Sequence, residues 1–410
     1  MTITPESTAP VLVSVAETLT VARSVAAEIA TGAVDRETRE ILPEAELRRV
    51  AESGLLGILV PGRFGGPDLP QSTAVEVLRI LSEADSAVGQ LLLAHFVLSA
   101  AIRGLGDTEP APTIYRDVLA GAQLGNATVE RGTRLSVDRL TTVTRGPGGW
   151  VLDGTKYYAT GTLGASWIAV AARIAGTEPA HGATVFVRPT DTGVTLNLDR
   201  WSSFGQRGTA SGEVVFDRVA VDDPYVIDEG PDPDPVTAPP SVLGAFDQAL
   251  HAAVDIGIAR AALTDGARFV TTRSRPWFEA GVEHAADEPH VVRRFGELTA
   301  RLYALEALLA AGTARIDEAL TESELTRESA AAASLQVAAA KALAQEFAVE
   351  IAGGVFELAG ASATDRGYAL DRHWRNVRVH SLHDPARWKY VHLGNHTLRG
   401  TLPPRLGVLL

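Results

Sequence analysis

The stretch TTVTRGPGGWVLDGTKYYATG, residues 141–161, decides the fold class of this chain. It holds two runs rich in β-branched and aromatic residues, separated by a Gly-Pro-Gly-Gly break, which is typical of paired β-strands. Similar short runs, WIAVAARI, ATVFVRP and GEVVFDRVAV, follow it. The pattern predicts an antiparallel β-domain in the middle of the chain.

Helical periodicity surrounds this β-region on both sides. AVEVLRILSEAD and QLLLAHFVLSAAIRGLG precede it, and long alanine-rich stretches such as GAFDQALHAAVDIGIARAALTDGARFV follow it, with apolar residues three and four positions apart. The segment DEGPDPDPVTAPPS disfavours helix and strand and is interpreted as a linker. We expect an α+β multidomain protein with a helical domain over residues 1–121, a β-domain with the linker over 122–242, and a helical bundle over 243–410.

Composition narrows the classes of function. The 410 residues carry a formal net charge of −13 and include no cysteine. An acidic chain without a basic run is an unsuitable nucleic-acid partner, and the lack of cysteine excludes disulfides, thiolate metal ligands and thiol nucleophiles. Residues 1–20 lack the basic start and apolar core of a signal peptide, and no run reaches about 18 apolar residues. We therefore expect a cytoplasmic protein that does not enter a membrane.

Common catalytic signatures are missing from the sequence. It has no G-x-x-x-x-G-K-[ST], no G-x-G-x-x-G between strand and helix, no H-E-x-x-H and no G-x-S-x-G. The two histidines of HAADEPH, residues 284–290, are spaced too widely for adjacent helical turns. We expect no metal site and no NAD(P)H site in this chain.

The C-terminal stretch RVHSLHDPARWKY, residues 378–390, is the first candidate site. If it is helical, His380, His383 and Asp384 share one face, and Pro385 ends one helix or begins the next. An imidazole next to a carboxylate is suited to proton transfer near neutral pH. Two histidines on an apolar helix are also commonly structural, so both readings stay open.

Further polar residues lie in apolar or β-rich surroundings. His95 lies within LLLAHFVL, where a structural hydrogen bond is the simpler explanation than a ligand. At predicted strand ends, small polar side chains and one tyrosine are suited to binding a planar heterocycle, although the same residues simply favour strands; these are Asn126, Thr128, Tyr158 and Thr160. Arg273 and Arg275 follow a long helix, where they can meet a phosphate or interact with the helix end.

Five ordered stretches resemble the acyl-CoA dehydrogenase superfamily: GLLGILVPGRFGGPDL, LGNATVERG, VLDGTKYYATG, RWSSFGQRGTASGEVVFDRVAV and ARFVTTRSRPW. The resemblance covers nearly the whole chain. It implies a helical domain, a β-domain and a C-terminal four-helix bundle, usually in a homotetramer, with flavin held between domains and against a neighbouring subunit.

Within that superfamily, HWRNVRVHSLHDPARWKYVHLGNHTL is most similar to the flavin-dependent monooxygenases that include dibenzothiophene monooxygenase and the sulfur-acquisition oxidoreductases. Arg375 and Asn376 stand where the dehydrogenases have an Arg-Asp pair, and Asp384-Pro385 replaces the catalytic Glu-Gly. A base shortened by one methylene is misplaced for α-proton removal, so dehydrogenation is the less favoured activity. Val129 also replaces a flavin-contacting threonine.

The resemblance implies a role for each candidate residue. Asn126 and Thr160 would hydrogen-bond the isoalloxazine or its C4a-hydroperoxide, with Thr128 beside them, and Tyr158 would lie against the ring. His383, oriented by Asp384 and assisted by His95, would act near the reactive carbon. Arg273 and Arg275 would meet the flavin phosphate, and Trp201, Phe204 and Gln206 would line the pocket.

The implied cofactor is FMN, because Glu350 and the bulky pair Val355-Phe356 are poorly suited to the adenine half of FAD. The resemblance therefore implies a two-component monooxygenase that takes reduced FMN from an NAD(P)H-dependent flavin reductase and uses O2 to oxygenate a small apolar substrate, with sulfur as the first choice of atom. The alternatives are an FAD-dependent acyl-CoA dehydrogenase with Asp384 as base, an N-hydroxylase of a small amine, and a catalytically silent flavin-binding paralogue.

Overall fold

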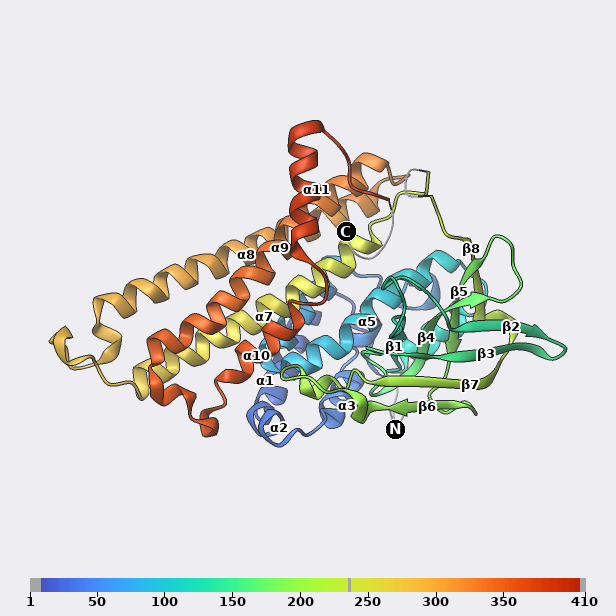
Figure 1. The fold of residues 1–410 in the computed structure, drawn as a ribbon. Coiled ribbons are helices and arrows are strands. Elements are labelled where there is room, and N and C mark those ends of the chain that lie inside the picture. The colour runs from blue at the N-terminus through green and yellow to red at the C-terminus, as the bar shows by residue number, and fades with distance from the viewer. Residues whose placement is uncertain (1–8, 235–236, 406–410) are drawn as a thin grey trace.

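A computed structural model describes residues 9–234 and 237–405 and has three parts in chain order: helices, a sheet, and a second set of helices (Figure 1). Part of the N-terminal stretch on which the signal-peptide expectation rests lies outside the described residues. The fold agrees with the predicted α+β multidomain class.

The first part surrounds the apolar helix α5. Its helices are α1 (Val15–Ala30), α2 (Ala33–Arg39), α3 (Glu44–Glu52), α4 (Gln71–Ala84), α5 (Ser86–Ile102) and α6 (Ala111–Leu119). The Asp85 side chain caps α5 by accepting hydrogen bonds from two backbone N–H groups of its first turn. The segment Ser86–Leu105 is long and apolar enough for a membrane span, but α5 packs against α4, α7 and β1, as a core helix does.

The second part is a twisted, mainly antiparallel sheet (Figure 1). Its strands are β1 (Gln123–Ala127), β2 (Thr142–Gly146), β3 (Gly149–Lys156), β4 (Ala165–Ile174), β5 (His181–Val187), β6 (Val194–Asn197), β7 (Glu213–Val221) and β8 (Val226–Pro231). They pair in the order β6-β7-β3-β2-β4-β5-β8, and β1 pairs with β4 in parallel. The stretch 141–161 forms the predicted β2–β3 hairpin. The prediction that DEGPDPDPVTAPPS, residues 228–241, is a linker without helix or strand is wrong for residues 228–231. These residues complete β8, which pairs with β5.

The third part contains three long helices that lie side by side in Figure 1. Its helices are α7 (Leu243–Thr272), α8 (Pro289–Thr321), α9 (Arg327–Ala359), α10 (Asp371–His380) and α11 (Ala386–Arg399). Helix α7 is the central element, because it packs against α8, α9 and α10 and also against α4 and α5 of the first part. The shared apolar core therefore joins the two helical parts.

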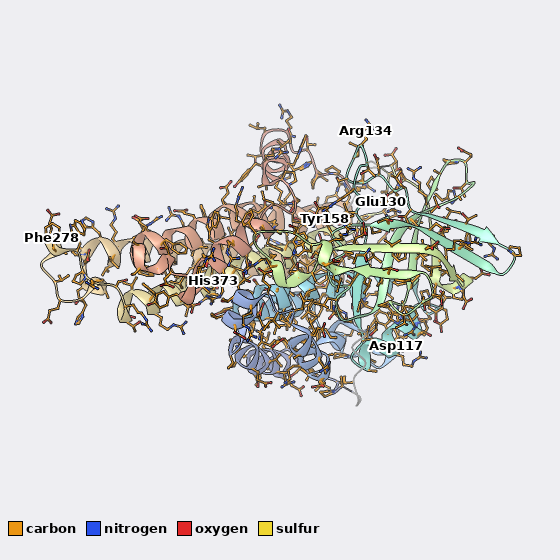
Figure 2. All side chains as sticks on the ribbon, turned by 60° about the horizontal axis from the view of Figure 1, so that its bottom comes forward. Asp117, Glu130, Arg134, Tyr158, Phe278 and His373 are labelled. Atoms are coloured by element: carbon orange, nitrogen blue, oxygen red, sulfur yellow. The ribbon has the colours of Figure 1, made fainter. Side chains whose placement is uncertain are left out.

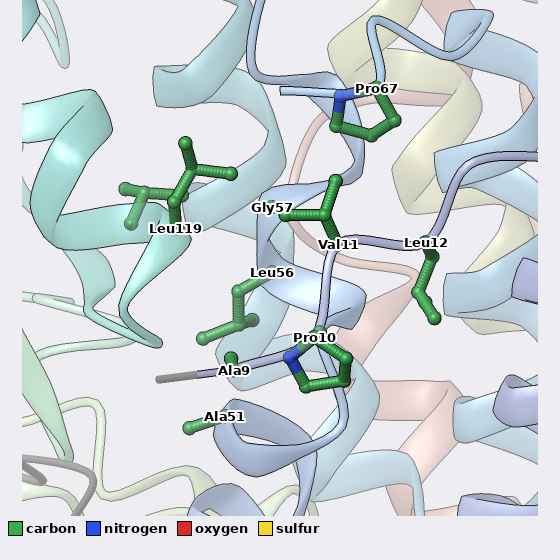
Figure 3. A pocket seen from close by; sticks show the side chains of 11 residues that line it. Ala9, Pro10, Val11, Leu12, Ala51, Leu56, Gly57, Pro67 and Leu119 are labelled. Atoms are coloured by element: carbon green, nitrogen blue, oxygen red, sulfur yellow. The ribbon is translucent and has the colours of Figure 1, made fainter. Parts of the chain in front are cut away.

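The positions of the labelled side chains in Figure 2 show where these parts meet. Tyr158 lies at the junction between the sheet and the helices, whereas Phe278 lies at the far tip of the bundle. The crevice in Figure 3, where Val11 and Leu12 cross the turn around Gly57, has essentially no free volume (≈ 0 Å³). That crevice is therefore too small for a ligand.

Candidate active site

Three of the candidate residues meet at one edge of the sheet. The backbone N–H of Asn126, near the end of β1, donates to the carbonyl of Thr160 at 3.3 Å. This close approach requires glycine, because a Cβ on Gly125 would lie 2.8 Å from the carbonyl oxygen of Gly161. Between them Tyr158 adopts a left-handed φ of 54°, and its ring stays 47% exposed. The turn thus presents an amide, a hydroxyl and an aromatic face together.

A chain of hydroxyl groups leads from this edge into the protein. Ser211 Oγ donates to Thr209 Oγ1 at 2.8 Å, and Thr209 Oγ1 donates to the Gln206 carbonyl at 2.8 Å. Since the one proton of Ser211 is used, Thr160 Oγ1 donates to Ser211 Oγ across their 2.9 Å contact. The Thr160 oxygen is then left as an acceptor. The indole N–H of Trp201 also donates to the Gln206 carbonyl, and the Trp201 ring lies edge-on to that of Tyr158.

Gln206 connects the sheet to the C-terminal helices. Its backbone N–H donates to Asn376 Oδ1 on α10 at 2.6 Å. Next to this contact, Glu37 from α2 pairs with Arg375 at 2.7 Å and with Arg207 at 3.2 Å. A single carboxylate therefore ties together residues from all three parts of the fold. Burial of these charges is acceptable because they are paired.

The C-terminal histidine stretch folds differently from the prediction. Helix α10 ends at His380, and the chain turns before Pro385 caps α11, so His383 and Asp384 do not continue the face of α10. The expectation of one helical face is wrong, because the turn intervenes, but the expectation that Pro385 begins the next helix is confirmed. The His383 side chain is 40% exposed and its ring stacks on His251, with centroids 3.8 Å apart.

Asp384 is held by a lysine that the sequence reading overlooked. Lys389 Nζ lies 2.6 Å from Asp384 Oδ2, whereas His383 Nδ1 is 3.5 Å from Asp384 Oδ1. Burial alone would raise the pKa of Asp384, but His383, Lys341 and Lys389 outweigh it and hold that pKa below its ordinary value. Asp384 is therefore a buried carboxylate that is ionised at neutral pH, and its closest charged partner is Lys389.

Behind His383 lies a polar cluster on α7 that the sequence reading also missed. Asp247, His251 and Asp255 are spaced four residues apart on α7, so they lie along one helical face, and all three are buried. Lys341 of α9 and His380 of α10 complete the cluster. The four-residue spacing of charged groups in an otherwise apolar helix was a usable signal.

These geometries can be compared with known proteins. The models of the N-terminal, middle and C-terminal domains of acyl-CoA dehydrogenases match residues 18–121, 126–219 and 249–388. The chain belongs to the acyl-CoA dehydrogenase family.

The similarity extends to family members of known chemistry. The chain is 32% identical over 400 residues to a dibenzothiophene monooxygenase from Rhodococcus qingshengii, with 93% of each chain covered. It is 29% identical to a probable FMNH2-dependent monooxygenase, SfnC, from Pseudomonas putida, covering 96% of this chain and 98% of SfnC. The crystal structure of FMN-bound TdsC from Paenibacillus sp. A11-2 superposes with a TM-score of 0.89 at 29% identity, covering 96% of this chain and all (100%) of TdsC.

His95 occupies a structural position in this acyl-CoA dehydrogenase fold. Its Nε2 is 2.8 Å from the carbonyl oxygen of Leu56, and its Nδ1 accepts the backbone N–H of Leu124 at 3.1 Å. Burial lowers the pKa of His95 to about 4, although the hydrogen bond to Leu56 opposes the shift, so the ring is neutral. Both ring nitrogens of His95 are therefore used in hydrogen bonds to the backbone, and neither is free to assist His383 or to bind a ligand. Through these bonds His95 connects α5 to β1.

The two arginines are separated from the rest of the site along α7. Arg273 follows the last residue of α7, 22 positions after His251, which corresponds to about 33 Å of helix. Its guanidinium lies over the ring of Tyr368, and Arg275 is exposed nearby. Within one chain, therefore, Arg273 and Arg275 do not join the site that contains His251 and His383.

The site at the sheet edge fits a flavin ring in this family. Asn126 Oδ1 is buried and has no hydrogen-bond partner within the protein. Gln206 Oε1 and Nε2 are also buried without a partner. Buried polar atoms without partners are uncommon in folded proteins and call for a ligand or water. Asn126 Oδ1, Gln206 Oε1 and the Thr160 oxygen are acceptors suited to the N–H groups of a reduced isoalloxazine, Gln206 Nε2 is a donor suited to a ring carbonyl, and the partly exposed Tyr158 is suited to its flat surface. The Thr128 side chain is exposed beside them, and only its carbonyl is engaged, by Lys156.

Proposed function

We propose that this chain is the oxygenase component of a two-component flavin monooxygenase. It takes reduced FMN from a separate NAD(P)H-dependent flavin reductase and inserts one oxygen atom of O2 into a small apolar substrate, at sulfur. The whole-length similarity to a dibenzothiophene monooxygenase and to a probable FMNH2-dependent monooxygenase supports this reaction class, and the TdsC likeness supports FMN as the cofactor.

The observation that carries the proposal is the state of Asp384. An acyl-CoA dehydrogenase needs a carboxylate that is free to take a proton from its substrate. Asp384 is 6% exposed, its Oδ2 is 2.6 Å from the Lys389 ammonium, and its pKa is lowered. A carboxylate held in this way is a weak base, and protonating it would leave Lys389 buried without its counter-ion. The site is therefore poorly suited to α-proton removal.

The chain's own residues would bind and orient the cofactor. When bound and reduced, FMN supplies the electrons that activate O2. Asn126 Oδ1 and Thr160 Oγ1 are acceptors for ring N–H groups, and the Tyr158 face is available for stacking. Trp201, fixed by its hydrogen bond to Gln206, covers the edge of Tyr158 and helps to exclude water.

His383 is the side chain that would move a proton in the proposed reaction. Its ring is partly exposed and stacked on one face, and Asp384 lies at 3.5 Å from its Nδ1. In the proposed reaction His383 holds a proton on the oxygen atom that is not transferred, which later leaves as water. Exclusion of water from the site would limit loss of both oxygen atoms as hydrogen peroxide.

The proposal includes a homo-oligomer, with a tetramer as the expected form. Arg273 and Arg275 lie too far from the His383 site to serve it in the same chain, and Trp277 and Phe278 beside them are 61% and 78% exposed. A second copy would bring these arginines to the phosphate of FMN. The expected location is the cytoplasm, where NAD(P)H supplies the reductase.

Turnover with the isolated components tests the proposal. The chain is mixed with FMN, a flavin reductase, NADH and dibenzothiophene in air, and the expected product is the sulfoxide or sulfone. In a parallel anaerobic experiment, acyl-CoA should leave the bound flavin coloured. Bleaching by acyl-CoA would favour the dehydrogenase, products from amines alone would favour the N-hydroxylase, and flavin binding without any oxygenated product would favour the silent paralogue.

A further inference from the structure

The buried cluster behind His383 contains a continuous hydrogen-bonded row. Lys341 Nζ lies 2.7 Å from Asp255 Oδ2, and Asp255 Oδ1 lies 2.7 Å from His380 Nδ1. The other ring nitrogen of His380, Nε2, lies 3.1 Å from His251 Nδ1. The row runs from α9 through α7 to α10 and returns to α7, and it ends at the ring on which His383 is stacked.

The direction of each hydrogen bond in the row follows from the charges. Burial would raise the pKa of Asp255, but Lys341 and His380 lower it below its ordinary value, so Asp255 is a carboxylate and only accepts. His380 Nδ1 therefore carries a proton. Burial lowers the pKa of His380, which leaves its Nε2 unprotonated and able to accept only from His251 Nδ1–H. Hence the row specifies one tautomer for each of the two imidazoles.

We propose that Asp255, His380 and His251 form a positioning relay for His383, in which the row keeps His251 neutral with Nδ1 protonated and the face of that ring supports His383. The catalytic consequence rests on the proposed function, whereas the tautomer does not. A neutral His251 ring places no positive charge against the His383 ring. The stacking of the two rings, with centroids 3.8 Å apart, also restricts the orientation of the partly exposed His383 side chain.

The charged and titratable groups around His251 agree with a neutral ring. They come from α7, α9, α10, the turn after α10, and α11, and comprise Asp247, Asp255, Lys341, His380, His383, Asp384 and Lys389. Burial lowers the pKa of His251 well below its ordinary value, and His383, His380 and the two lysines lower it further. Asp247, 3.9 Å from His251 Nε2, has its pKa raised to about 6 by burial and gives that nitrogen no short acceptor contact.

Stability does not account for the relay, because apolar residues would fill the same space without desolvating the four polar side chains of the row. Replacing a buried ionic network with apolar residues is often neutral or stabilising. A role in positioning explains why the row points at the partly exposed His383.

Four variants separate the tautomer from simple packing. His380→Gln preserves a donor for Asp255 and an acceptor for His251, whereas His380→Leu removes both. His251→Phe preserves a flat neutral ring beneath His383, whereas His251→Ala removes it. The exposed His396→Ala serves as the matched control.

The first measurement uses the full-length protein without flavin. Nitrogen-15 histidine spectra at pH 7 should show His251 neutral with Nδ1 protonated in the wild type, the same tautomer in His380→Gln, and its loss in His380→Leu. An Nε2-protonated or cationic His251 in the wild type would overturn the relay. If His380→Leu does not fold, the wild-type and His380→Gln spectra still decide the question.

The second measurement is the ratio of oxygenated product to hydrogen peroxide in the reconstituted enzyme. His251→Ala should lower this ratio about 2- to 10-fold, the factor that corresponds to a lost ring-stacking contact. His251→Phe should retain more coupling than His251→Ala. Equal coupling in His251→Ala and wild type would refute the positioning role, while absence of any oxygenated product in the wild type would refute the proposed function and leave the spectra interpretable.

Discussion

Replacement of Asn126 by leucine gives opposite effects on the free protein and on its complex with FMN. Leucine fills a similar volume but removes Asn126 Oδ1, which is buried without a partner. An unsatisfied buried acceptor costs about 1–3 kcal/mol, so the free energy of unfolding of the flavin-free protein should stay constant or rise by up to that amount. In the complex, the flavin N–H that Asn126 accepts would become the unpaired group. The same cost then raises the Kd of FMN about 5- to 150-fold.

The assay combines FMN titration, followed by flavin fluorescence, with urea unfolding of the flavin-free protein. Asn197→Leu is the matched control, because Asn197 Nδ2 already has a protein partner, Glu213 Oε1 at 2.8 Å in the β6–β7 pair, and is not one of the proposed flavin contacts. The control should lose stability and keep its FMN affinity. Wild-type FMN affinity in Asn126→Leu, or a loss of stability as large as that of Asn197→Leu, would refute the assignment of Asn126 as a flavin acceptor.

Three further substitutions test separate parts of the account. His95→Leu leaves the Leu56 carbonyl and the Leu124 N–H unpaired, so urea unfolding should show a loss of about 2–5 kcal/mol; a loss below 1 kcal/mol would contradict the bridge. The folded-state pKa of Asp247 is raised to about 6, so ionisation of Asp247 destabilises the protein as the pH rises from about 4 to 6. Asp247→Asn should therefore raise the melting temperature more at pH 8 than at pH 4. Equal increases at the two pH values would contradict the raised pKa. Arg273→Ala should weaken FMN binding by the oligomer about 10- to 100-fold, as for a lost charge-assisted contact, whereas Arg268→Ala, whose partner is Asp265, should not; similar affinities would remove Arg273 from the phosphate site.

Local sequence patterns predicted the order of helices and sheet because each element has its own period. The hairpin at 141–161 and the long helix α7 both show it clearly. The end of α10 at His380 was not predictable from a local period, because the histidine spacing also suits a continuous helix. The turn after α10 is fixed instead by Gln345 of α9, whose side-chain amide donates to the carbonyls of Ser381 and Asp384. Contacts of this kind join residues about 40 positions apart and leave no local period.

The sequence named Asn126, Tyr158 and Thr160 as candidate site residues, but it did not indicate the side chains that support them. Asn126, Tyr158 and Thr160 meet because the end of β1 contacts the turn after β3 at Gly125 and Gly161. Lys389 was not predicted, because a lysine within a helix gives no indication of which partner it meets after folding, whereas the four-residue spacing of Asp247, His251 and Asp255 on α7 was a signal for His251. Asp384 illustrates the consequence. The sequence predicted that Asp384 pairs with the adjacent His383, but Lys389 lies closer to its carboxylate.

The most direct test of the central claim follows the oxygen atom. Reduced FMN is supplied by a flavin reductase under isotopically labelled O2, and the product formed from dibenzothiophene is examined by mass spectrometry. The account predicts that the oxygen on sulfur comes from O2, and that replacing His383 by alanine shifts consumption of reduced FMN towards hydrogen peroxide. Product oxygen derived from water, or flavin reduced by acyl-CoA with no oxygenated product, would contradict it.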